Sequence, residues 1–261
     1  MFGAVCSIVK LHFLGTRGNI DVRTAEHFKH TALAVSYRGR RVILDCGGDW
    51  LDEARGWNAA AIVITHAHPD HVDGLKRGAP CPVYTTRESW KRIRGFPIRE
   101  RLTVRPRRKY RIAGMTFIPF DVEHSLRAPA VGYRITAGNT TVFYCPDLVS
   151  IRDRQAALRG IVAYIGDGAT ISGSLVRRRG RRSIGHARID VQLGWCKKSG
   201  VPRAIITHCG TEIVTAPKAV LQDQLNVMSR TFGLRLEVAH DGMELTLRHR
   251  SKSAGKRTTR R

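Results

Sequence analysis

The sequence predicts a one-domain α/β sandwich, with β-sheets inside and helices outside. Short apolar runs typical of strands recur along the chain, and helical patterns separate several of them in the second half. No linker rich in proline, glycine or serine divides the 261 residues, of which 42% are hydrophobic. This is enough apolar material for a substantial core. We therefore expect one domain over residues 1–247 and a basic, disordered tail over residues 248–261.

The predicted strands are apolar runs of strand length. Most are rich in valine, isoleucine, threonine or aromatic residues, which fit a half-buried pleated surface. In chain order they span residues 8–15, 31–37, 41–47, 61–66, 115–120, 130–136, 140–146, 161–167, 203–208, 234–240 and 243–247.

Three segments have helical patterns. Residues 49–55 follow a pair of glycines, and residues 218–233 repeat apolar positions at helical spacing. Within residues 186–200, the side chains of Ile189 and Leu193 fall on one face, and the final glycine is a typical helix end. Helices that alternate with strands in this way favour a layered fold in which they cover the sheets.

Several predicted strands end on a charged or metal-binding type of residue. Residues at strand ends can gather at one edge of a layered fold, where loops build the active site. Side chains that are distant in the sequence can then share one centre. The residues concerned are Asp45, His66, Asp167, His208 and His240.

The chain is strongly basic, with a formal net charge of +24 at pH 7. Its basic residues gather at residues 99–111, 177–182 and 248–261. Such clusters attract polyanions by releasing condensed counterions, so nucleic acid is one expected partner. The alternative is a solvated basic surface, because no pattern of stacking aromatic residues accompanies the clusters.

The sequence lacks the marks of a membrane or secreted protein. No apolar run approaches the roughly 20 residues of a membrane-spanning helix, and the first residues do not resemble a signal peptide. The six cysteines lack the spacing of a metal site or a disulfide framework. We therefore expect reduced thiols, no membrane partner and a cytoplasmic location.

The densest cluster of metal-binding residue types lies in the segment THAHPDHVDGL, residues 65–75. His66, His68, Asp70 and His71 fall within six residues, and the proline among them disfavours a helix, so we expect a loop. Imidazoles and carboxylates are ligands that Zn²⁺ and its divalent neighbours prefer. One tetrahedral ion would not take four ligands from a single loop, which indicates two adjacent metal ions.

The motif HAHPDH resembles the HxHxDH signature of the metallo-β-lactamase superfamily. LHFLGTRGN and VILDCG are similar to the opening strands of its ribonuclease Z branch. Three further motifs follow in the same order as in that branch. His124 lies in EHSLRAPAVGYRI, Asp147 in FYCPD and His208 in IITHCG.

The resemblance implies a four-layer αββα sandwich with a dinuclear metal site. We expect zinc in this site, with manganese or iron(II) as alternatives. The implied ligands are His66, His68 and His124 for one ion, Asp70, His71 and His208 for the other, and Asp147 for both.

The implied reaction is hydrolysis. Two adjacent divalent ions lower the pKa of a bridging water, so its hydroxide would be the nucleophile, and Asp70 counts among the catalytic residues as well as the ligands. His186 is the candidate general acid for the leaving group, because its context is similar to a histidine segment of ribonuclease Z. Asp167, at the matching place, would orient His186 and raise its pKa. The structural alternative is that His186 caps a helix and Asp167 ends a strand.

We favour a phosphodiester substrate, because the contexts of His124 and His186 are similar to those of phosphodiesterases. A nuclease fits the basic clusters. A small cyclic phosphodiester fits the lack of a Gly/Pro-rich arm of the kind that clamps transfer RNA in ribonuclease Z.

Two other functions stay open, namely a thioester or lactone hydrolase of the same fold and a non-catalytic nucleic-acid-binding protein with structural metals. A homodimer stays open too. His240 either supports the metal ligands or belongs to a hairpin turn.

Overall fold

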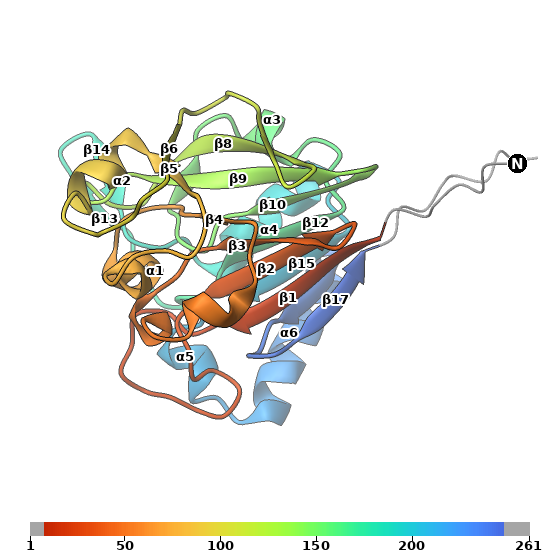
Figure 1. Ribbon diagram of the computed structural model, residues 1–261. Coiled ribbons are helices and arrows are strands. Elements are labelled where there is room, and N and C mark those ends of the chain that lie inside the picture. The colour runs from red at the N-terminus through yellow and green to blue at the C-terminus, as the bar shows by residue number, and fades with distance from the viewer. Residues whose placement is uncertain (1–7, 248–261) are drawn as a thin grey trace, which may run out of the picture.

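The computed structural model describes residues 8–247, which form two β-sheets packed face to face with helices on both outer sides (Figure 1). The predicted four-layer αββα sandwich is thereby confirmed. Among the described residues, no helix combines the length and apolar character needed to cross a membrane. The basic cluster at residues 248–261 lies outside the described part of the chain.

The first sheet has seven strands in the order β17-β1-β2-β3-β4-β5-β6. Strands β17, β1, β2 and β3 pair antiparallel, whereas β3, β4, β5 and β6 run parallel. The bounds are β1 (Val9–Gly15), β2 (Ala32–Tyr37), β3 (Arg40–Leu44), β4 (Ala61–Val63), β5 (Val83–Thr86), β6 (Arg101–Val104) and β17 (Glu244–Leu247).

The second sheet has the order β11-β8-β9-β10-β12-β15-β16, and β7 also pairs with β8. Its strands β10, β12, β15 and β16 run parallel. The bounds are β7 (Tyr110–Ile112), β8 (Met115–Glu123), β9 (Ala130–Ala137), β10 (Thr140–Tyr144), β11 (Ser150–Ile151), β12 (Ala163–Asp167), β15 (Arg203–Thr207) and β16 (Arg235–Val238). A separate hairpin joins β13 (Arg177–Arg179) to β14 (Arg182–Ile184).

Helices and short turns cover the outer face of each sheet. The first sheet carries η1 (Gly48–Trp50), η2 (Ala54–Trp57), α1 (Pro69–Val72), η3 (Asp73–Leu75) and α2 (Arg87–Arg92). The second sheet carries α3 (Arg154–Leu158), α4 (Ile189–Lys198), α5 (Thr211–Val214) and α6 (Lys218–Phe232).

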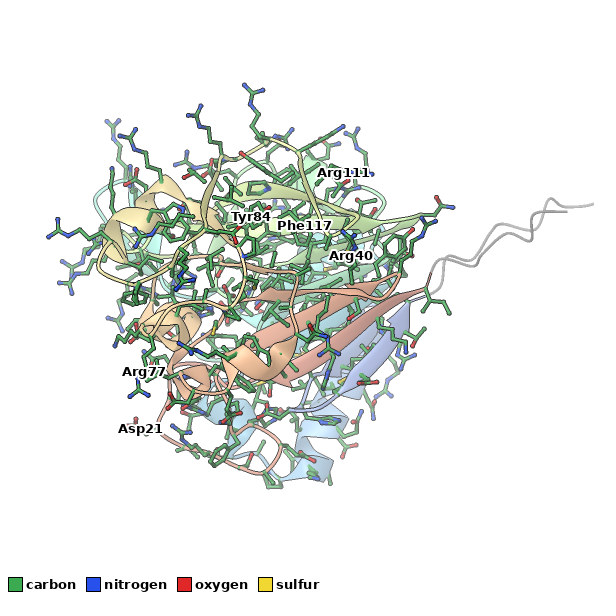
Figure 2. The ribbon with its side chains drawn as sticks, in the orientation of Figure 1. Asp21, Arg40, Arg77, Tyr84, Arg111 and Phe117 are labelled. Atoms are coloured by element: carbon green, nitrogen blue, oxygen red, sulfur yellow. The ribbon has the colours of Figure 1, made fainter. Side chains whose placement is uncertain are left out.

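Three apolar clusters hold the four layers together. One lies between the sheets and includes Leu11, Phe117 and Tyr133, while the other two lie between each sheet and its outer helices. Phe117 lies inside the sandwich, whereas Arg77 and Arg111 lie at its periphery (Figure 2). Each fully buried large apolar side chain contributes about 1.5–3 kcal/mol to the free energy of unfolding, so these clusters fix the relative position of the layers.

Two local predictions are wrong. Residues 49–55 form the 3₁₀ turns η1 and η2 rather than one helix. The metal-binding motif does not form a loop throughout, because Pro69 begins the one-turn helix α1. Proline is well suited to the first helical position, where its missing N–H has no intrahelical partner to bond.

Parallel strands bring the functional candidates to one edge. Asp45 and His66 follow β3 and β4 in the first sheet, while Asp167 ends β12 and His208 follows β15 in the second. The strands in each set run parallel, so their carboxyl ends meet at the same edge. Asp45 and His208 have positive φ angles of 63° and 54°, which turn the chain sharply at that edge.

Candidate metal centre

The HAHPDH motif is shaped by the turn from β4 into α1. His68 is the N-cap of α1 and has extended backbone angles, and the proline after it starts the helix. Asp70 and His71 therefore lie in the first helical turn, while His66 precedes it. His66 and His71 are fully buried, Asp70 is nearly so, and His68 is half-buried.

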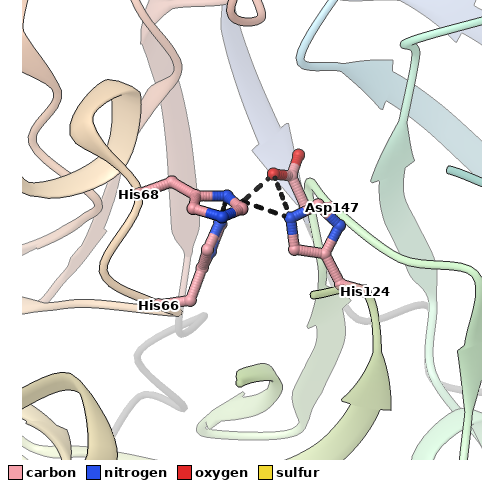
Figure 3. A group of neighbouring side chains, drawn as sticks. All are labelled: His66, His68, His124 and Asp147. Atoms are coloured by element: carbon pink, nitrogen blue, oxygen red, sulfur yellow. Dashed lines mark hydrogen bonds and ion pairs between the residues drawn. The ribbon is translucent and has the colours of Figure 1, made fainter. Parts of the chain in front are cut away.

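One group of candidate ligands contains three histidines and one aspartate (Figure 3). The Nδ1 atom of His68 lies 3.0 Å from His66 Nε2 and 3.1 Å from His124 Nε2. Both Nε2 atoms lie 3.3 Å from Asp147 Oδ2. Three imidazoles and a carboxylate, with ligand atoms all within 4.8 Å of one another, suit one divalent ion.

A second group shares Asp147 with the first. The Oδ2 atom of Asp70 lies 3.2 Å from His71 Nε2 and 3.1 Å from His208 Nε2. Asp147 Oδ2 lies 3.3 Å from His71 Nε2, and Asp147 Oδ1 lies 2.9 Å from His208 Nδ1. The carboxylate of Asp147 therefore stands between two candidate ion positions.

Hydrogen bonds decide which ring nitrogens face the centre. Three of the histidines donate Nδ1–H to a neighbouring protein oxygen, so in the neutral ring Nε2 is an acceptor. The acceptors are Thr65 Oγ1 for His66 at 3.0 Å, Asp45 Oδ2 for His71 at 3.1 Å and the Gly185 carbonyl for His124 at 3.0 Å. Each of these Nε2 atoms then directs a lone pair towards the Asp147 carboxylate, and only a proton or a cation between them makes that contact favourable.

Several buried atoms of the centre lack a hydrogen-bond partner. Within residues 8–247, His71 Nε2, His208 Nδ1 and Asp147 Oδ1 have none, although their neighbours lie at ion-pair distance. Unpaired buried polar atoms are costly, and each case calls for an explanation. A divalent ion in each group would bind these atoms, so the residues present fit such ions.

The histidines of the first group are prepared to bind a cation. Burial lowers the pKa of His66, His68 and His124 to about 4. Their imidazoles are therefore neutral at pH 7, which is the form that binds a metal.

In the second group, the pKa values of the histidines shift in the opposite direction. Burial by itself would lower the pKa of His71 and His208, but the nearby carboxylates outweigh it and raise both pKa values well above the ordinary value. The charges of these histidines in turn hold the pKa of Asp70 and Asp147 well below the usual range, although burial opposes this. Without a metal ion, protons take its place between these side chains.

Asp45 supports the ligands, a role that its predicted position at a strand end did not indicate. It is fully buried and accepts hydrogen bonds from His71 Nδ1 at 3.1 Å, Tyr144 Oη at 3.1 Å and the Thr65 backbone N–H at 2.8 Å. It also accepts from the Thr65 hydroxyl, which in turn accepts from His66 Nδ1. One carboxylate thus orients a histidine in each group, directly or through one hydroxyl.

His186 and Asp167 lie beside both groups. The Nδ1 atom of His186 donates to Asp167 Oδ2 at 2.8 Å. The His186 ring stacks on His208 at 5.6 Å and lies 5.0 Å from the His124 ring, measured between ring centroids. Burial tends to lower the pKa of His186, but Asp167 outweighs it, so this pKa is raised.

Of the remaining sequence candidates, one lies away from the centre and one basic cluster lies beside it. His240 is exposed and donates to the carbonyl of Asp241, so the interpretation that it supports the metal ligands is wrong. Arg127 is exposed. Residues 99–111 include β6 and the first two residues of β7, while residues 177–182 form most of the β13–β14 hairpin next to His124.

The family model described as "Beta-lactamase superfamily domain" matches residues 40–209. This segment contains both histidine–aspartate groups, from His66 to His208. The match covers more than half of the chain and includes every candidate ligand.

A curated relative is ribonuclease Z of Methanopyrus kandleri, which is 26% identical over 175 residues. The alignment covers 59% of this chain and 61% of the relative. The chain therefore matches only about three fifths of the length of that ribonuclease Z.

Solved structures share the fold. The metallo-beta-lactamase fold protein YhfI of Bacillus subtilis has a TM-score of 0.73 at 14% identity, covering 92% of this chain and 100% of that chain. A diphosphatase from the PhnP family has a TM-score of 0.68 at 22% identity, covering 92% of this chain and 97% of that chain. At these identities the similarity establishes a common architecture.

Proposed function

This chain belongs to the beta-lactamase superfamily, and on that premise we propose that it is a phosphodiesterase that works with two divalent metal ions. The observation that carries the proposal is the position of Asp147. Its carboxylate lies within 3.3 Å of histidine nitrogens from both groups. A carboxylate shared in this way suits a pair of adjacent ions.

The ligand assignment follows from the two groups. Zinc is the first choice of metal, because imidazoles and carboxylates dominate both sets, and manganese or iron(II) are alternatives. When bound, the two ions would activate water near neutral pH and neutralise charge on substrate oxygens. The ligands would be His66, His68 and His124 for one ion, Asp70, His71 and His208 for the other, and Asp147 for both.

His186 is the proposed general acid. Its Nδ1 atom is engaged by Asp167, so Nε2 is the atom that would deliver a proton to the leaving oxygen. Its side chain is 21% exposed, whereas Asp167 is fully buried, so a substrate can reach the histidine but not the carboxylate. Asp167 also accepts from the backbone N–H groups of Leu148 and Ala169, which fix its position and thereby that of the imidazole.

A phosphodiester is the proposed substrate because the site suits a negatively charged substrate whose alcohol is a poor leaving group. A separate proton donor is most useful when the leaving oxygen is basic, as in an alkyl phosphodiester. The similarity to ribonuclease Z and to a PhnP-family diphosphatase supports the same class. Ions in the two groups would also offset the negative charge of such a substrate.

The test compares two phosphodiesters in the zinc- or manganese-loaded protein. Bis-p-nitrophenyl phosphate has a good leaving group, whereas a dinucleotide has a poor one. His186→Ala is expected to lower kcat/KM for the dinucleotide by roughly 10²- to 10⁴-fold, and that for the nitrophenyl ester by much less. Asp70→Ala is expected to lower the metal content and both activities.

The matched control is His240→Ala, which removes an exposed histidine away from the centre. It should leave metal content and both activities unchanged.

A His186→Ala variant that loses one equivalent of metal would instead make His186 a ligand, since its ring nitrogen also lies within 4.8 Å of the ligand atoms of Asp147, Asp167 and His208. Fully loaded protein that hydrolyses thioesters or lactones but no phosphodiester would refute the substrate class. Loaded protein without any hydrolysis would leave the metals with a structural role.

A further inference from the structure

We propose that the β13–β14 hairpin binds the phosphate backbone of a polynucleotide strand and leads it to the metal centre. This inference rests on the proposed phosphodiesterase function and specifies its substrate. The hairpin, residues 175–185, carries five arginines and no acidic residue. If the hairpin binds such a strand, the natural substrate is a nucleic acid rather than a small cyclic phosphodiester.

The base of the hairpin is fixed to a candidate metal ligand. The Gly185 N–H donates to the His124 carbonyl at 2.8 Å, and His124 Nδ1 donates back to the Gly185 carbonyl at 3.0 Å. Gly185 has a φ of 111°, and a Cβ atom there would lie 1.9 Å from the Leu175 carbonyl oxygen. The two ends of the hairpin therefore meet at a glycine that touches the metal centre, and His186 follows directly.

No described residue neutralises the charge of the hairpin. All five arginines are exposed, and within residues 8–247 none of them forms an ion pair or a side-chain hydrogen bond. Other arginines differ in this respect, for example Arg188, which pairs with Asp190, and Arg77, which pairs with Asp52. The hairpin arginines are Arg177, Arg178, Arg179, Arg181 and Arg182.

A small cavity lies beside the hairpin, and the candidate ligand His124 forms part of its wall. Its volume is about 130 Å³, and it is lined by Arg182 of the hairpin, Arg152 beyond β11, and His124. Asp121 and Glu123 also line it, but neither forms an ion pair with the two arginines, and Glu123 accepts from the Ser150 hydroxyl at 3.0 Å. Both guanidinium groups lack a side-chain partner among the described residues, and beside a ligand histidine they are placed to bind a phosphate next to the scissile one.

The composition of the hairpin indicates how it would bind. It contains no aromatic side chain on which a base could stack, and arginine side chains at this density contact phosphates. Binding should therefore depend on salt and little on sequence. The tip at Gly180 is five residues from Gly185, which is roughly 17 Å at 3.3–3.4 Å per strand residue. A dinucleotide at the metals would not reach the tip, whereas a longer strand would.

An anionic membrane surface is the competing partner for a basic hairpin that also exposes Leu175 and Val176. The polynucleotide is favoured because Gly185 of the hairpin is hydrogen-bonded to the candidate ligand His124, and because His124 and Arg182 line the same cavity. A membrane headgroup would gain nothing from that connection. Vesicles are therefore included as a separate arm of the test.

The test uses the tip variant Arg179→Gln/Arg181→Gln in the metal-loaded full chain. The matched control is Lys10→Gln/Arg40→Gln, which removes two exposed charges at the opposite end of the strands. In Figure 1, α1, β13 and β14 lie on the left, whereas β1 begins and β17 ends on the right. Both variants are assayed with 20-residue single-stranded RNA and DNA, with a dinucleotide and with bis-p-nitrophenyl phosphate.

We expect the tip variant to lower kcat/KM for the 20-residue strand, relative to the dinucleotide, by roughly tenfold at 0.15 M salt. The estimate follows from counterion release, because each lost single-strand phosphate contact weakens binding about fourfold at that salt concentration. The slope of log affinity against log salt concentration is negative, and its magnitude should decrease by about 1.4 when two contacts are lost. Arg179→Lys/Arg181→Lys keeps the charge and should keep most of this slope, and the control variant should change neither quantity.

The inference is overturned if the tip variant and the control bind the labelled 20-residue strand equally well by fluorescence anisotropy. It is also overturned if the tip variant loses binding to vesicles containing phosphatidylserine while its binding to the strand is unchanged. Should the parent protein hydrolyse no phosphodiester, the proposed function fails, and the anisotropy measurement still decides whether the hairpin binds nucleic acid. Equal binding of RNA and DNA would identify the shared phosphate backbone as the ligand.

Discussion

Replacing Asp45 by asparagine tests whether one buried carboxylate orients both groups of metal ligands. Asparagine keeps the shape and tolerates the positive φ of this position. However, either orientation of its amide turns an NH₂ group towards a donor. In one orientation the NH₂ faces His71 Nδ1 and Tyr144 Oη, and in the other it faces the Thr65 N–H.

The expected loss follows from these contacts. Removing the partner of a metal-bound histidine lowers metal affinity by about 10- to 100-fold, which is roughly 1.4–2.8 kcal/mol of binding free energy. Asp45 supports His71 directly and His66 through the Thr65 hydroxyl, so both metal affinities should fall. A buried donor left without an acceptor should also lower the free energy of unfolding of the metal-free protein by about 1–3 kcal/mol.

Thr65→Val separates the two effects, because it removes the hydroxyl link to His66 and keeps the direct bond from His71 to Asp45. Competition with a chromophoric chelator measures both metal dissociation constants, and urea unfolding measures stability. Asp45→Asn should weaken both ions, whereas Thr65→Val should weaken mainly the ion bound by the His66 group. Unchanged affinities in Asp45→Asn, or equal losses at both ions in Thr65→Val, would refute this reasoning.

Three further predictions follow from the same geometry. Metal binding to the second group should release protons at pH 7, because the raised pKa values of His71 and His208 keep them protonated without metal. Calorimetry in buffers of different ionisation enthalpy measures the release, which should decrease above those pKa values. Asp167→Asn should lower kcat and shift the basic limb of the pH–rate profile to lower pH. The reason is that the acid form of His186 exists only below its pKa, which Asp167 raises. An unshifted limb would exclude His186 as the titrating acid. Gly47→Ala should lower the free energy of unfolding and the metal content together, because a Cβ atom there would lie 2.0 Å from the α1 backbone, and thermal unfolding with metal analysis checks this.

Much of the fold and of the candidate centre could be predicted because the relevant signals are local. Apolar runs predicted most strands of both central sheets within a few residues, as for residues 8–15, which contain β1 (Val9–Gly15), and residues 115–120, which begin β8 (Met115–Glu123). The histidine motif and its order relative to His124 and His208 located the centre, which the structure brings together from both sheets.

Other features depend on tertiary context. The strands β5 and β6 are short, and most of β6 is exposed, so no alternating pattern marks it. The support given by Asp45 could not be predicted, because its hydrogen bond to His71 joins residues 26 positions apart. Likewise, RRRGRR has the composition of a solvated basic run, and only the contact between Gly185 and His124 shows that it stands beside the metal centre.

The most direct test of a two-metal phosphodiesterase is a titration of metal-free protein with Zn²⁺ while bis-p-nitrophenyl phosphate hydrolysis is followed. Activity should rise to a plateau at two ions per chain, because Asp147 joins two complete sets of ligands. A plateau at one ion per chain, or no hydrolysis with two ions bound, would contradict the proposal.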